Sequence, residues 1–265
     1  MFQITPSASA AKVIANDNCF QVCFTDPNQG TASADYIASK GLATKVAVIY
    51  NSSDAYSSGI YDNFKAEAAA KGLDLVASEA FTGDSKQDFS SQLSKIKASG
   101  AELIFLPIYY QEASLILSQA KNAGITAKFF GCDGLDGILA VENFDLSLAK
   151  GVMLLTPFAA DAQDDLTQKF VTSYQEKYGE VPNQFAADTY DAMYIIKAAA
   201  EKANVTPDMS VSDICDAMKV AMTEITYDGL TGTGMTWSAD GEPSKAPKAV
   251  VIDIAEDGTG SYKAM

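Results

Sequence analysis

Between residues 44 and 131 the hydrophobic pattern alternates short apolar runs with longer segments that are apolar on one side only. Short apolar runs between turn residues are typical of buried strands, and apolar positions three or four apart are typical of helices. The pattern predicts strands at 45–50, 73–81, 102–107 and 128–131, and helices at 58–71, 89–98 and 112–122. This alternation indicates an α/β fold with a parallel sheet between layers of helices.

The flanks of this block, 1–40 and 156–240, are predicted to be rich in helix and poor in strand. In the first flank the pattern predicts a strand at 19–24 and then a helix at 31–40. Around the second it predicts a strand at 151–156 and then helices at 164–178, 186–203 and 211–222. The tail adds strands at 234–237 and 248–254. The flanks therefore indicate a second lobe with little sheet of its own.

The N-terminal segment combines an apolar run, a Thr5-Pro6 turn and a helical pattern that starts at Ala10. Ser7 is a candidate helix N-cap, because a serine hydroxyl accepts from free N–H groups of the first turn. A strand end and a helix start together predict a seat for an anion at Ser7–Ser9. An ordinary strand–helix turn with a capping serine is the alternative that these residues leave open.

The composition excludes several classes of function. A net charge of −15 argues against binding to nucleic acid or anionic membranes. The chain has no His, and all 19 of its basic residues are Lys. The missing His removes the usual general base and nearly all catalytic zinc sites, and the missing Arg removes the bidentate partner of carboxylates. A bound anion must therefore rest on backbone N–H groups, hydroxyls or Lys.

The four cysteines suggest neither a disulfide framework nor a metal site. Cys19 and Cys23 flank a predicted strand and fall on one face of it, too far apart to bridge comfortably. Since no CxxC pair is present, we expect Cys132 and Cys215 as well to be small buried apolar residues. The sequence contains no recognisable signal peptide, lipidation motif or apolar run of membrane-spanning length.

Five stretches, in one order along the chain, carry a resemblance to a known family. They are Ile4–Ala10, Phe20–Gly30, Lys45–Tyr50 with Ser57–Gly59, Phe130–Gly134 and Asp240–Gly241. Together they resemble the type I periplasmic binding proteins, specifically the Leu/Ile/Val-binding-protein-like receptors of branched-chain amino-acid ABC importers. The resemblance implies two three-layer αβα lobes with parallel sheets, joined by three crossovers, which close on a small amino acid. It implies no enzymatic activity, no cofactor and no metal.

The resemblance also implies the two polar ends of a ligand site. Ser7, Ala8 and Ser9 stand where the family holds the ligand α-carboxylate, with Ser9 in place of a common Thr. Asp133 matches the acidic residue of the other lobe that pairs with the α-ammonium group, and Asp26 is a further candidate near the ammonium. Without the family, Asp133 between Cys132 and Gly134 could equally be a turn residue.

Aromatic residues complete the implied site. Tyr56 and Tyr109 match aromatics that close over the ligand, with Tyr110 as an alternative to Tyr109, and Phe185 lies where a residue contacting the ligand side chain is often found. Tyr56 is also favoured by fold class, because ligands bind at the carboxyl edge of a parallel sheet. Rim packing is the alternative for Tyr109 and Tyr110, and core packing for Phe185. We assign Asp188 and Asp191, on one predicted helix, to a solvated or interlobe face.

The implied domain organisation is an N-terminal lobe of 1–42 and 157–240, and a C-terminal lobe of 43–156 and 241–265. Family members have several strand–helix units ahead of the motif at Ile4, about a hundred residues at roughly 30 per unit, so the N-terminal lobe is predicted to be truncated. Its exposed sheet edges predict self-association or strand exchange. The resemblance implies a periplasmic or extracellular lipoprotein that works with a membrane permease.

The sequence therefore predicts an extracytoplasmic receptor for a free neutral or branched aliphatic amino acid, acting by hinge closure. Two alternatives remain. An enzyme domain on a flavodoxin-like sheet could use Cys132 or Asp133, although it would lack His, a Gly-rich phosphate loop and a metal-spaced cluster. A ligand-sensing regulatory or receptor domain of the same fold would need a DNA-binding or membrane segment, and the sequence contains none.

Overall fold

The computed structural model describes all 265 residues, and the chain divides into two compact units. Unit 1 comprises Met1–Thr25 and Pro157–Pro247, and unit 2 comprises Asp26–Thr156 and Lys248–Met265. The chain thus passes between them three times. The division differs from the expected one in that residues 26–42 belong to unit 2, because the helix over 26–39 packs along the next helix of that unit. Residues 241–247 belong to unit 1.

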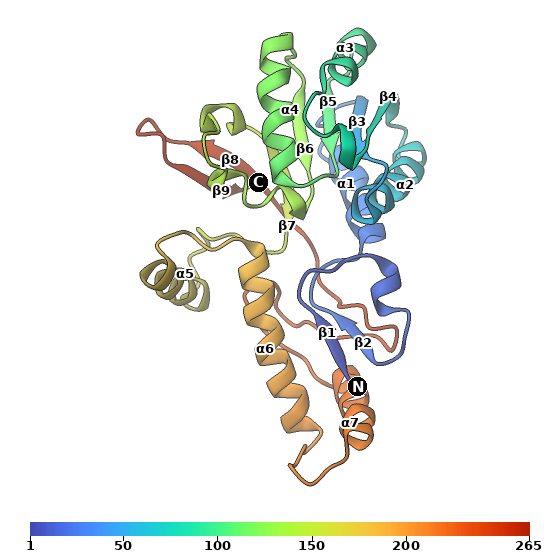
Figure 1. The fold of residues 1–265 in the computed structure, drawn as a ribbon, viewed down its shortest axis with the longest axis vertical. Coiled ribbons are helices and arrows are strands. Elements are labelled where there is room, and N and C mark those ends of the chain that lie inside the picture. The colour runs from blue at the N-terminus through green and yellow to red at the C-terminus, as the bar shows by residue number, and fades with distance from the viewer. The chain divides into compact units, whose positions relative to one another are not determined.

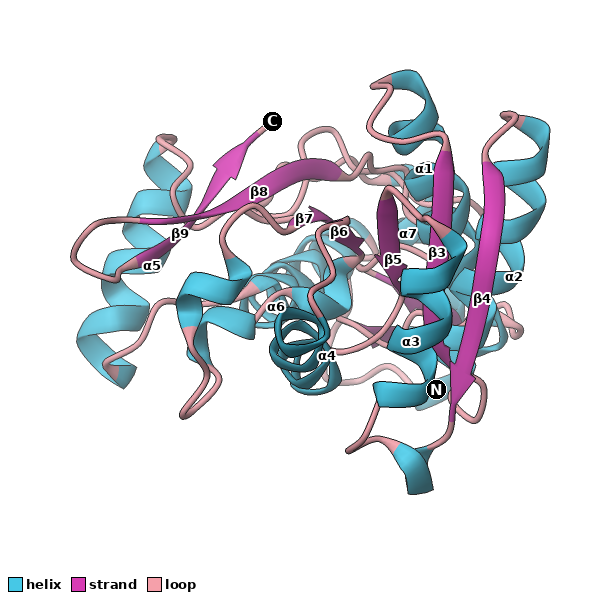
Figure 2. Ribbon diagram, turned by 90° about the horizontal axis from the view of Figure 1, so that it is seen from above, coloured by secondary structure: helices cyan, strands magenta, loops and turns pink.

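Unit 2 is built on a seven-stranded sheet in the order β4-β3-β5-β6-β7-β8-β9. Its strands are β3 (Lys45–Asn51), β4 (Asp74–Phe81), β5 (Leu103–Leu106), β6 (Lys128–Gly131), β7 (Met153–Thr156), β8 (Lys248–Ile254) and β9 (Gly260–Ala264). The first five are parallel to one another, as predicted, and Figure 2 shows β3 and β4 side by side. β8 and β9 add an antiparallel edge, which the expectation of a parallel sheet did not include.

Four helices cover this sheet: α1 (Asp26–Ser39), α2 (Ala55–Ala70), α3 (Ser90–Ser99) and α4 (Tyr110–Ala123). Val46 and Val48 of β3 pack in one cluster with apolar residues of α1 and α2, while Ala47 and Ile49 are buried on the opposite face. Gly30 lets α1 approach α2 closely, because a Cβ there would lie 2.4 Å from a backbone oxygen of α2. The sheet is therefore buried on both sides, as a three-layer αβα architecture requires.

Unit 1 has far less sheet. Its two strands, β1 (Gln3–Thr5) and β2 (Cys19–Gln21), pair in parallel and form a sheet of their own. The rest of unit 1 contains the short 3-10 helix η1 (Ala11–Ile14) and the helices α5 (Asp165–Tyr178), α6 (Gln184–Lys202) and α7 (Val211–Glu224), of which α6 and α7 are drawn in orange in Figure 1. Phe20, Ile195, Met222 and Trp237 belong to its main apolar cluster. The prediction of a helix-rich lobe with few strands is confirmed.

Two local predictions in unit 1 are wrong. Ser7 caps no helix, since the following helix is the four-residue η1, whose N-cap position is Ala10 without a side-chain bond. Residues 234–237 form isolated antiparallel bridges, at Met235 and at Trp237, in place of a strand. In both places a loop is held by bonds to residues distant in the sequence, which a local pattern does not reveal.

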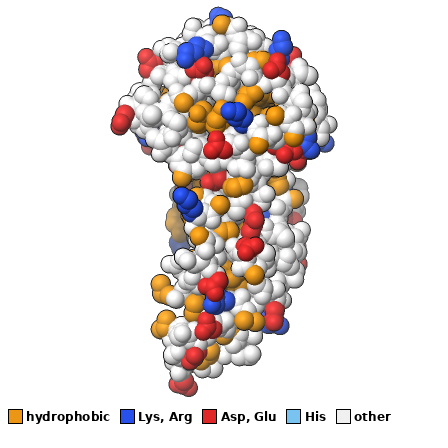
Figure 3. Space-filling view, turned by 90° about the vertical axis from the view of Figure 1, so that its right-hand side faces the viewer, with side chains coloured by type: hydrophobic (Ala, Val, Ile, Leu, Met, Phe, Trp, Pro, Cys, Tyr) orange, Lys and Arg blue, Asp and Glu red, His pale blue; other side chains and the backbone are white.

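The remaining short 3-10 helices lie in unit 2: η2 (Gly83–Ser85), η3 (Asp133–Leu135), η4 (Ile138–Ala140) and η5 (Leu146–Ala149). None of the helices has the length and apolar character required of a membrane span. On the face shown in Figure 3, acidic and lysine side chains are interspersed without a continuous basic patch.

Candidate functional site

A buried carboxylate lies at the centre of the polar residues of unit 2. Asp133 lies just beyond the end of β6, separated from it only by Cys132; it is the first residue of η3 and is 5% exposed. Its Oδ1 accepts a hydrogen bond from the Tyr56 hydroxyl at 2.7 Å, and its Oδ2 accepts one from Nε2 of Gln29 at 3.0 Å. Both donors are neutral, so the negative charge of Asp133 has hydrogen bonds but no cation bonded to it.

The pKa of Asp133 is raised from 3.8 to about 7, chiefly by burial, and the nearby charge of Asp26 is a further cause of the increase. The hydrogen bonds from Tyr56 and Gln29 act in the opposite direction, because they favour the ionised form. An acid with a pKa near neutrality is ready to ionise fully when a cation arrives beside it. The arrangement therefore suits the binding of a cationic group.

Tyr56 is fixed in place by contacts at both of its ends. Its backbone N–H donates to the N-cap Asp54 of α2 at 3.3 Å, and its hydroxyl accepts from the Gly134 N–H at 2.9 Å while donating to Asp133. A Cβ on Gly134 would lie 2.6 Å from that hydroxyl, so glycine is needed for this approach. Burial, followed by the charge of Asp133, raises the pKa of Tyr56 well above its usual value, which keeps the hydroxyl protonated as a donor.

A second tyrosine extends this surface towards solvent. The ring of Tyr109, at the N-cap position of α4, stacks on that of Tyr56 with centroids 4.7 Å apart. Tyr109 is 38% exposed and Tyr56 only 6%. Burial raises the pKa of Tyr109 as well, with the charges of Asp54 and Asp133 as further causes. Tyr110, the alternative to Tyr109, is the first residue of α4. The pair presents one accessible aromatic face beside the buried carboxylate.

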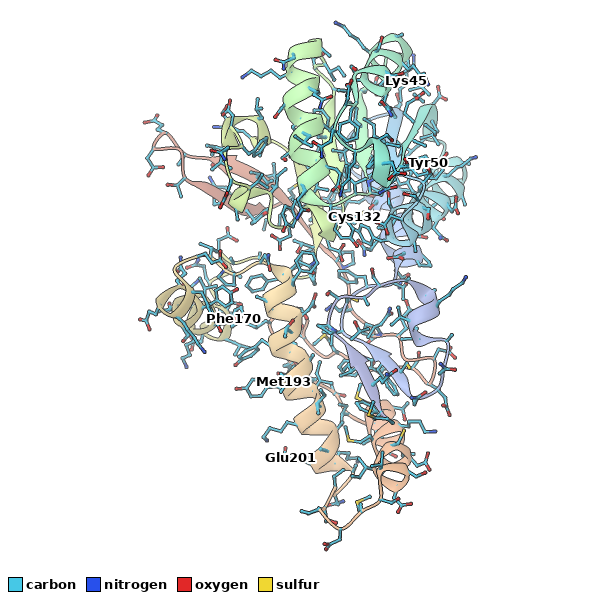
Figure 4. The ribbon with its side chains drawn as sticks, in the orientation of Figure 1. Lys45, Tyr50, Cys132, Phe170, Met193 and Glu201 are labelled. Carbon is cyan, nitrogen blue, oxygen red and sulfur yellow. The ribbon has the colours of Figure 1, made fainter.

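The topology of unit 2 explains why these residues meet. β3, β5 and β6 are neighbouring parallel strands, and Tyr56, Tyr109 and Asp133 each lie in the segment that follows one of them. The carboxyl ends of parallel strands lie at one edge of the sheet, the usual ligand-binding edge of such folds. Cys132, which follows β6, is labelled at this end of the sheet in Figure 4. Unit 2 thus brings together Asp26, Tyr56, Tyr109 and Asp133.

The predicted anion seat belongs to unit 1. Between β1 and η1 the chain is irregular, and the Ala8 N–H donates to the Thr5 hydroxyl at 2.9 Å. The hydroxyls of Ser7 and Ser9 form no hydrogen bonds, although Ser9 is only 6% exposed. The seat therefore offers two hydroxyls and backbone groups, but it has no helix dipole behind it, since η1 begins at Ala11 and is a single turn.

Phe185, the remaining candidate, is half-buried in the first turn of α6 in unit 1. On the same helix, Asp188 and Asp191 are assigned from the sequence to a solvated or interlobe face, and the solvated alternative is wrong because both are fully buried. Asp191 accepts the backbone N–H groups of Leu230 and Thr231 and the Thr231 hydroxyl, at 2.7–2.9 Å. Its role is to hold the 230–231 loop on α6.

Asp188 pairs with Lys245, a lysine whose side chain is only 1% exposed. Lys245 Nζ lies 3.2 Å from Asp188 Oδ1 and also donates to the Val22 carbonyl and the Thr231 hydroxyl. Its ammonium lies 5.3 Å from the centre of the Phe24 ring. A lysine with this many partners is a structural tie and is not available to a ligand.

The cysteines lack the features of catalytic groups. All four are free and buried, as predicted for their environment. The Cys132 thiol lies 3.5 Å from the Ser33 hydroxyl, and burial raises its pKa, which disfavours the reactive thiolate. No group of three or more His, Cys, Asp or Glu residues is arranged to hold a metal ion. These observations give no support to the enzyme alternative.

Two residues of the site were missed from the sequence. Gln29 lies one helical turn after Asp26, and Gln21 ends β2 directly before Val22; both stand inside the stretch that carries the resemblance. The spacing of Gln29 from Asp26 was a usable signal, because residues three apart share a helix face. Gln21 offered none, since its partners are the backbone carbonyls of Ala8 and Ala10.

Comparison with known proteins agrees with this architecture. Residues 2–259 match the family described as "Periplasmic binding protein". The Leu/Ile/Val-binding protein homolog 3 of Brucella melitensis is 30% identical over 210 residues, which cover 78% of this chain and 56% of that protein. The chain thus spans little more than half the length of this relative.

Solved structures give the same answer. The leucine-binding protein LivK of Thermotoga maritima matches with a TM-score of 0.84 at 25% identity, over 98% of this chain and 71% of that one. The branched-chain amino-acid substrate-binding protein LivJ of Streptococcus pneumoniae, solved with isoleucine, matches with a TM-score of 0.78 at 25% identity, over 99% and 72% of the two chains. The chain therefore belongs to the periplasmic binding protein family and has the type I fold of its amino-acid-binding members.

Proposed function

We propose that the chain is the ligand-binding part of an extracytoplasmic receptor that captures a free neutral amino acid for an ABC importer. The observation that carries this proposal is the Asp133 carboxylate, which is buried and hydrogen-bonded only to neutral groups in unit 2. Burying a charge without an opposite charge is unfavourable, so the site is completed when a cation binds there. The α-ammonium of an amino acid is such a cation.

Each unit supplies a complementary part of this proposed site. In unit 2, Asp133 pairs with the ammonium, Asp26 adds negative charge beside it, and the stacked Tyr56 and Tyr109 cover the ligand. In unit 1, the Ser7–Ser9 seat takes the carboxylate through hydroxyl and backbone N–H groups, and Phe185 contacts the ligand side chain. The chain passes between the units three times, so closure of one unit on the other is the proposed binding motion.

The chemistry of the candidates favours an apolar ligand side chain. The chain has no Arg or His, and its most deeply buried lysine, Lys245, already has several acceptors. An acidic ligand side chain would therefore find no cation among these residues. The stacked tyrosines offer an apolar face to a branched aliphatic group, and relatives described as Leu/Ile/Val-binding support the same ligand class.

Titration calorimetry with the twenty amino acids tests this function. Leucine, isoleucine or valine should bind best, and glutamate should not bind. Benzoate and isoamylamine, which each lack one of the two polar ends, should bind far more weakly than leucine. Asp133→Ala should abolish binding while the circular dichroism spectrum stays unchanged.

A longer protein should be measured in parallel, because this chain spans little more than half of its relative. A fusion that carries the preceding strand–helix units of the Brucella melitensis relative would serve. Binding only by the fusion would show that the added units contribute to the site. Absence of amino-acid binding in both proteins would overturn the receptor function.

The location and the transport partner follow from the same proposal. A receptor of this kind acts outside the cytoplasm, as a periplasmic protein or a lipoprotein, and delivers its ligand to a membrane permease. Reconstitution of the receptor with its permease in vesicles should give leucine uptake that requires ATP inside and receptor outside. Uptake that is equally fast without the receptor would contradict this partnership.

We further propose that the chain self-associates through the outer edge of β1. β1 pairs only with β2, so one edge of the strand is unpaired. Gln3 N–H donates to Asn18 and the Thr5 carbonyl accepts from Val22, so the backbone groups of the intervening Ile4 point away from β2. A twofold-related copy presents the same pair of groups in reverse, which makes this edge self-complementary.

The surface beside this edge is apolar and hollow, which favours such a contact. A groove of about 450 Å³ is lined mainly by Phe2, Ile4, Val13, Phe20 and Ile196. Light scattering after size exclusion should show a dimer that strengthens with salt, because the net charge of −15 opposes association. Ile4→Pro, which removes the edge donor, should give a monomer. Val220→Lys, at an exposed valine of α7, should leave the dimer intact, and a wild-type monomer would contradict the proposal.

A further inference from the structure

Gln21 holds the irregular segment between β1 and η1 from inside unit 1. Its side chain is fully buried, and its Nε2 donates to the Ala8 carbonyl at 2.8 Å and lies 3.5 Å from the Ala10 carbonyl. The backbone N–H of Ala8, in turn, donates to the Thr5 hydroxyl. Both backbone polar groups of Ala8 are therefore hydrogen-bonded. The hydroxyl of Ser9, which lies between Ala8 and Ala10, forms no hydrogen bond.

We propose that Gln21 is a positioning residue that sets the geometry of the Ser7–Ser9 seat for a carboxylate. This inference rests on the proposed function. The seat has no Arg and no helix dipole, so its affinity for an anion depends on how well a few hydroxyl and N–H groups are oriented. The side chain of Gln21 is the contact that fixes this orientation from below.

The unpaired oxygen of Gln21 supports a role beyond packing. Its Oε1 is buried and forms no hydrogen bond. An unsatisfied buried acceptor costs about 1–3 kcal/mol, so an apolar side chain of similar length would serve stability as well. A glutamine is needed at this position for its donor, and the donor points at the seat.

The rest of Gln21 is tied to a different part of unit 1. Its backbone N–H donates to the Gly241 carbonyl at 3.0 Å, and its carbonyl accepts from the Trp237 indole at 2.7 Å. These bonds are made by the backbone, so they persist when the side chain is changed. They also supply a control, because Trp237→Phe removes a buried bond from the same residue without touching the seat.

The test compares Gln21→Met with Trp237→Phe. Gln21→Met should fold, since it removes an unpaired buried oxygen and leaves the Ala8 carbonyl on an exposed residue that water can reach. The affinity for leucine should fall about tenfold, as expected for the loss of a well-placed hydrogen bond. The affinity for leucinamide, which has no carboxylate, should stay the same. Trp237→Phe should leave the ratio of the two affinities unchanged.

A second measurement requires no ligand. Amide order parameters from 15N relaxation at Ala8, Ser9 and Ala10 should be near 0.85 in the wild type and in Trp237→Phe, and below about 0.6 in Gln21→Met. Rigid amides in Gln21→Met would overturn the positioning role even if no amino acid bound. If these amides became mobile in Gln21→Met but the wild type bound no leucine, the receptor function would be refuted and the positioning role of Gln21 would stand. An equal loss of leucine and leucinamide affinity would also overturn the inference.

Discussion

Because Asp133 is buried, we expect its ionised form to lower the free energy of unfolding of the protein. A carboxyl group whose pKa is about 7 in the folded chain and 3.8 when solvated binds its proton more tightly in the folded state. At a pH below both values it is protonated in both states and has no effect on folding. As the pH rises from 4 to 7 the unfolded state is increasingly favoured, and above 7 the full penalty is present.

The substitution Asp133→Asn removes this charge and keeps the hydrogen bonds. The asparagine oxygen can accept from Tyr56, and its amide can donate to Gln29 if the Gln29 amide turns over, since the Gln29 Oε1 has no partner at present. The difference between the two pKa values corresponds to about 4 kcal/mol at about 1.4 kcal/mol per pKa unit. We expect Asp133→Asn to raise the free energy of unfolding by about 2–4 kcal/mol at pH 8.

The assay is guanidinium unfolding of unit 2, followed by the circular dichroism of its helices, at pH 8 and at pH 4. At pH 4 the gain should be under about 1 kcal/mol, because the wild-type carboxyl is then largely protonated in the folded state and half protonated in the unfolded state. Asp62→Asn, a carboxyl-to-amide change at an exposed position of α2, should change stability by under about 0.5 kcal/mol at either pH. Leucine binding should be lost in Asp133→Asn and kept in Asp62→Asn.

Two results would refute this reasoning. If Asp133→Asn were less stable than the wild type at pH 8, the carboxylate would be stabilising the fold, and its role would be structural. If the gain were the same at pH 4 and pH 8, it would come from packing and not from the ionisation of Asp133. A gain in the free energy of unfolding that occurs only at high pH, together with loss of leucine binding, would show that the Asp133 charge serves ligand binding at the expense of stability.

Three further outcomes are expected. Asp26→Asn should lower the pKa of Asp133, because the Asp26 charge is one of the causes that raise it; leucine affinity, which should fall about tenfold per pH unit as the pH drops below 7, should then start to fall at a lower pH in calorimetry. Gly30→Ala should lower the melting temperature strongly, since its Cβ would lie 2.4 Å from a backbone oxygen of α2, whereas Gly59→Ala, with its nearest neighbour at 3.3 Å, should be milder; equal effects would contradict the close-packing argument. Lys245→Met should destabilise unit 1 by about 3–5 kcal/mol in urea unfolding, because it leaves a buried aspartate without its cation, and a change to asparagine at that aspartate should recover part of the loss.

The parallel core of unit 2 could be predicted from the sequence because its signals are local. β6 was predicted with its observed bounds, and β3 and β4 within a residue at each end. The antiparallel edge could not be predicted, since nothing in the apolar run of β8 says which strand it pairs with. β9 was missed altogether, because Gly260–Ala264 carries no apolar run and forms a strand only through its pairing with β8.

The errors in unit 1 have a common physical cause. The Ala-rich pattern after Ser7 predicts a helix with a serine cap, but the Thr5 hydroxyl takes the Ala8 N–H and Gln21 takes the Ala8 carbonyl, so helical turns begin only at Ala11. Asp188 is buried because Lys245, 57 residues further on, reaches it. Each correction depends on a partner that is close in space and distant in sequence.

The buried glutamines Gln21 and Gln29 show how a chain without Arg can orient the groups that bind the two charged ends of a ligand. Gln21 in unit 1 and Gln29 in unit 2 are both buried, and each donates through Nε2 to a group of the proposed site: the Ala8 carbonyl and the Asp133 carboxylate. Each also leaves a buried Oε1 without a partner. An unpaired buried oxygen lowers stability, so neither glutamine is explained by stability alone. A neutral donor can orient a carbonyl or a carboxylate without cancelling its charge, and the Asp133 charge thereby stays available for an ammonium group, as an Arg in the same place would not allow.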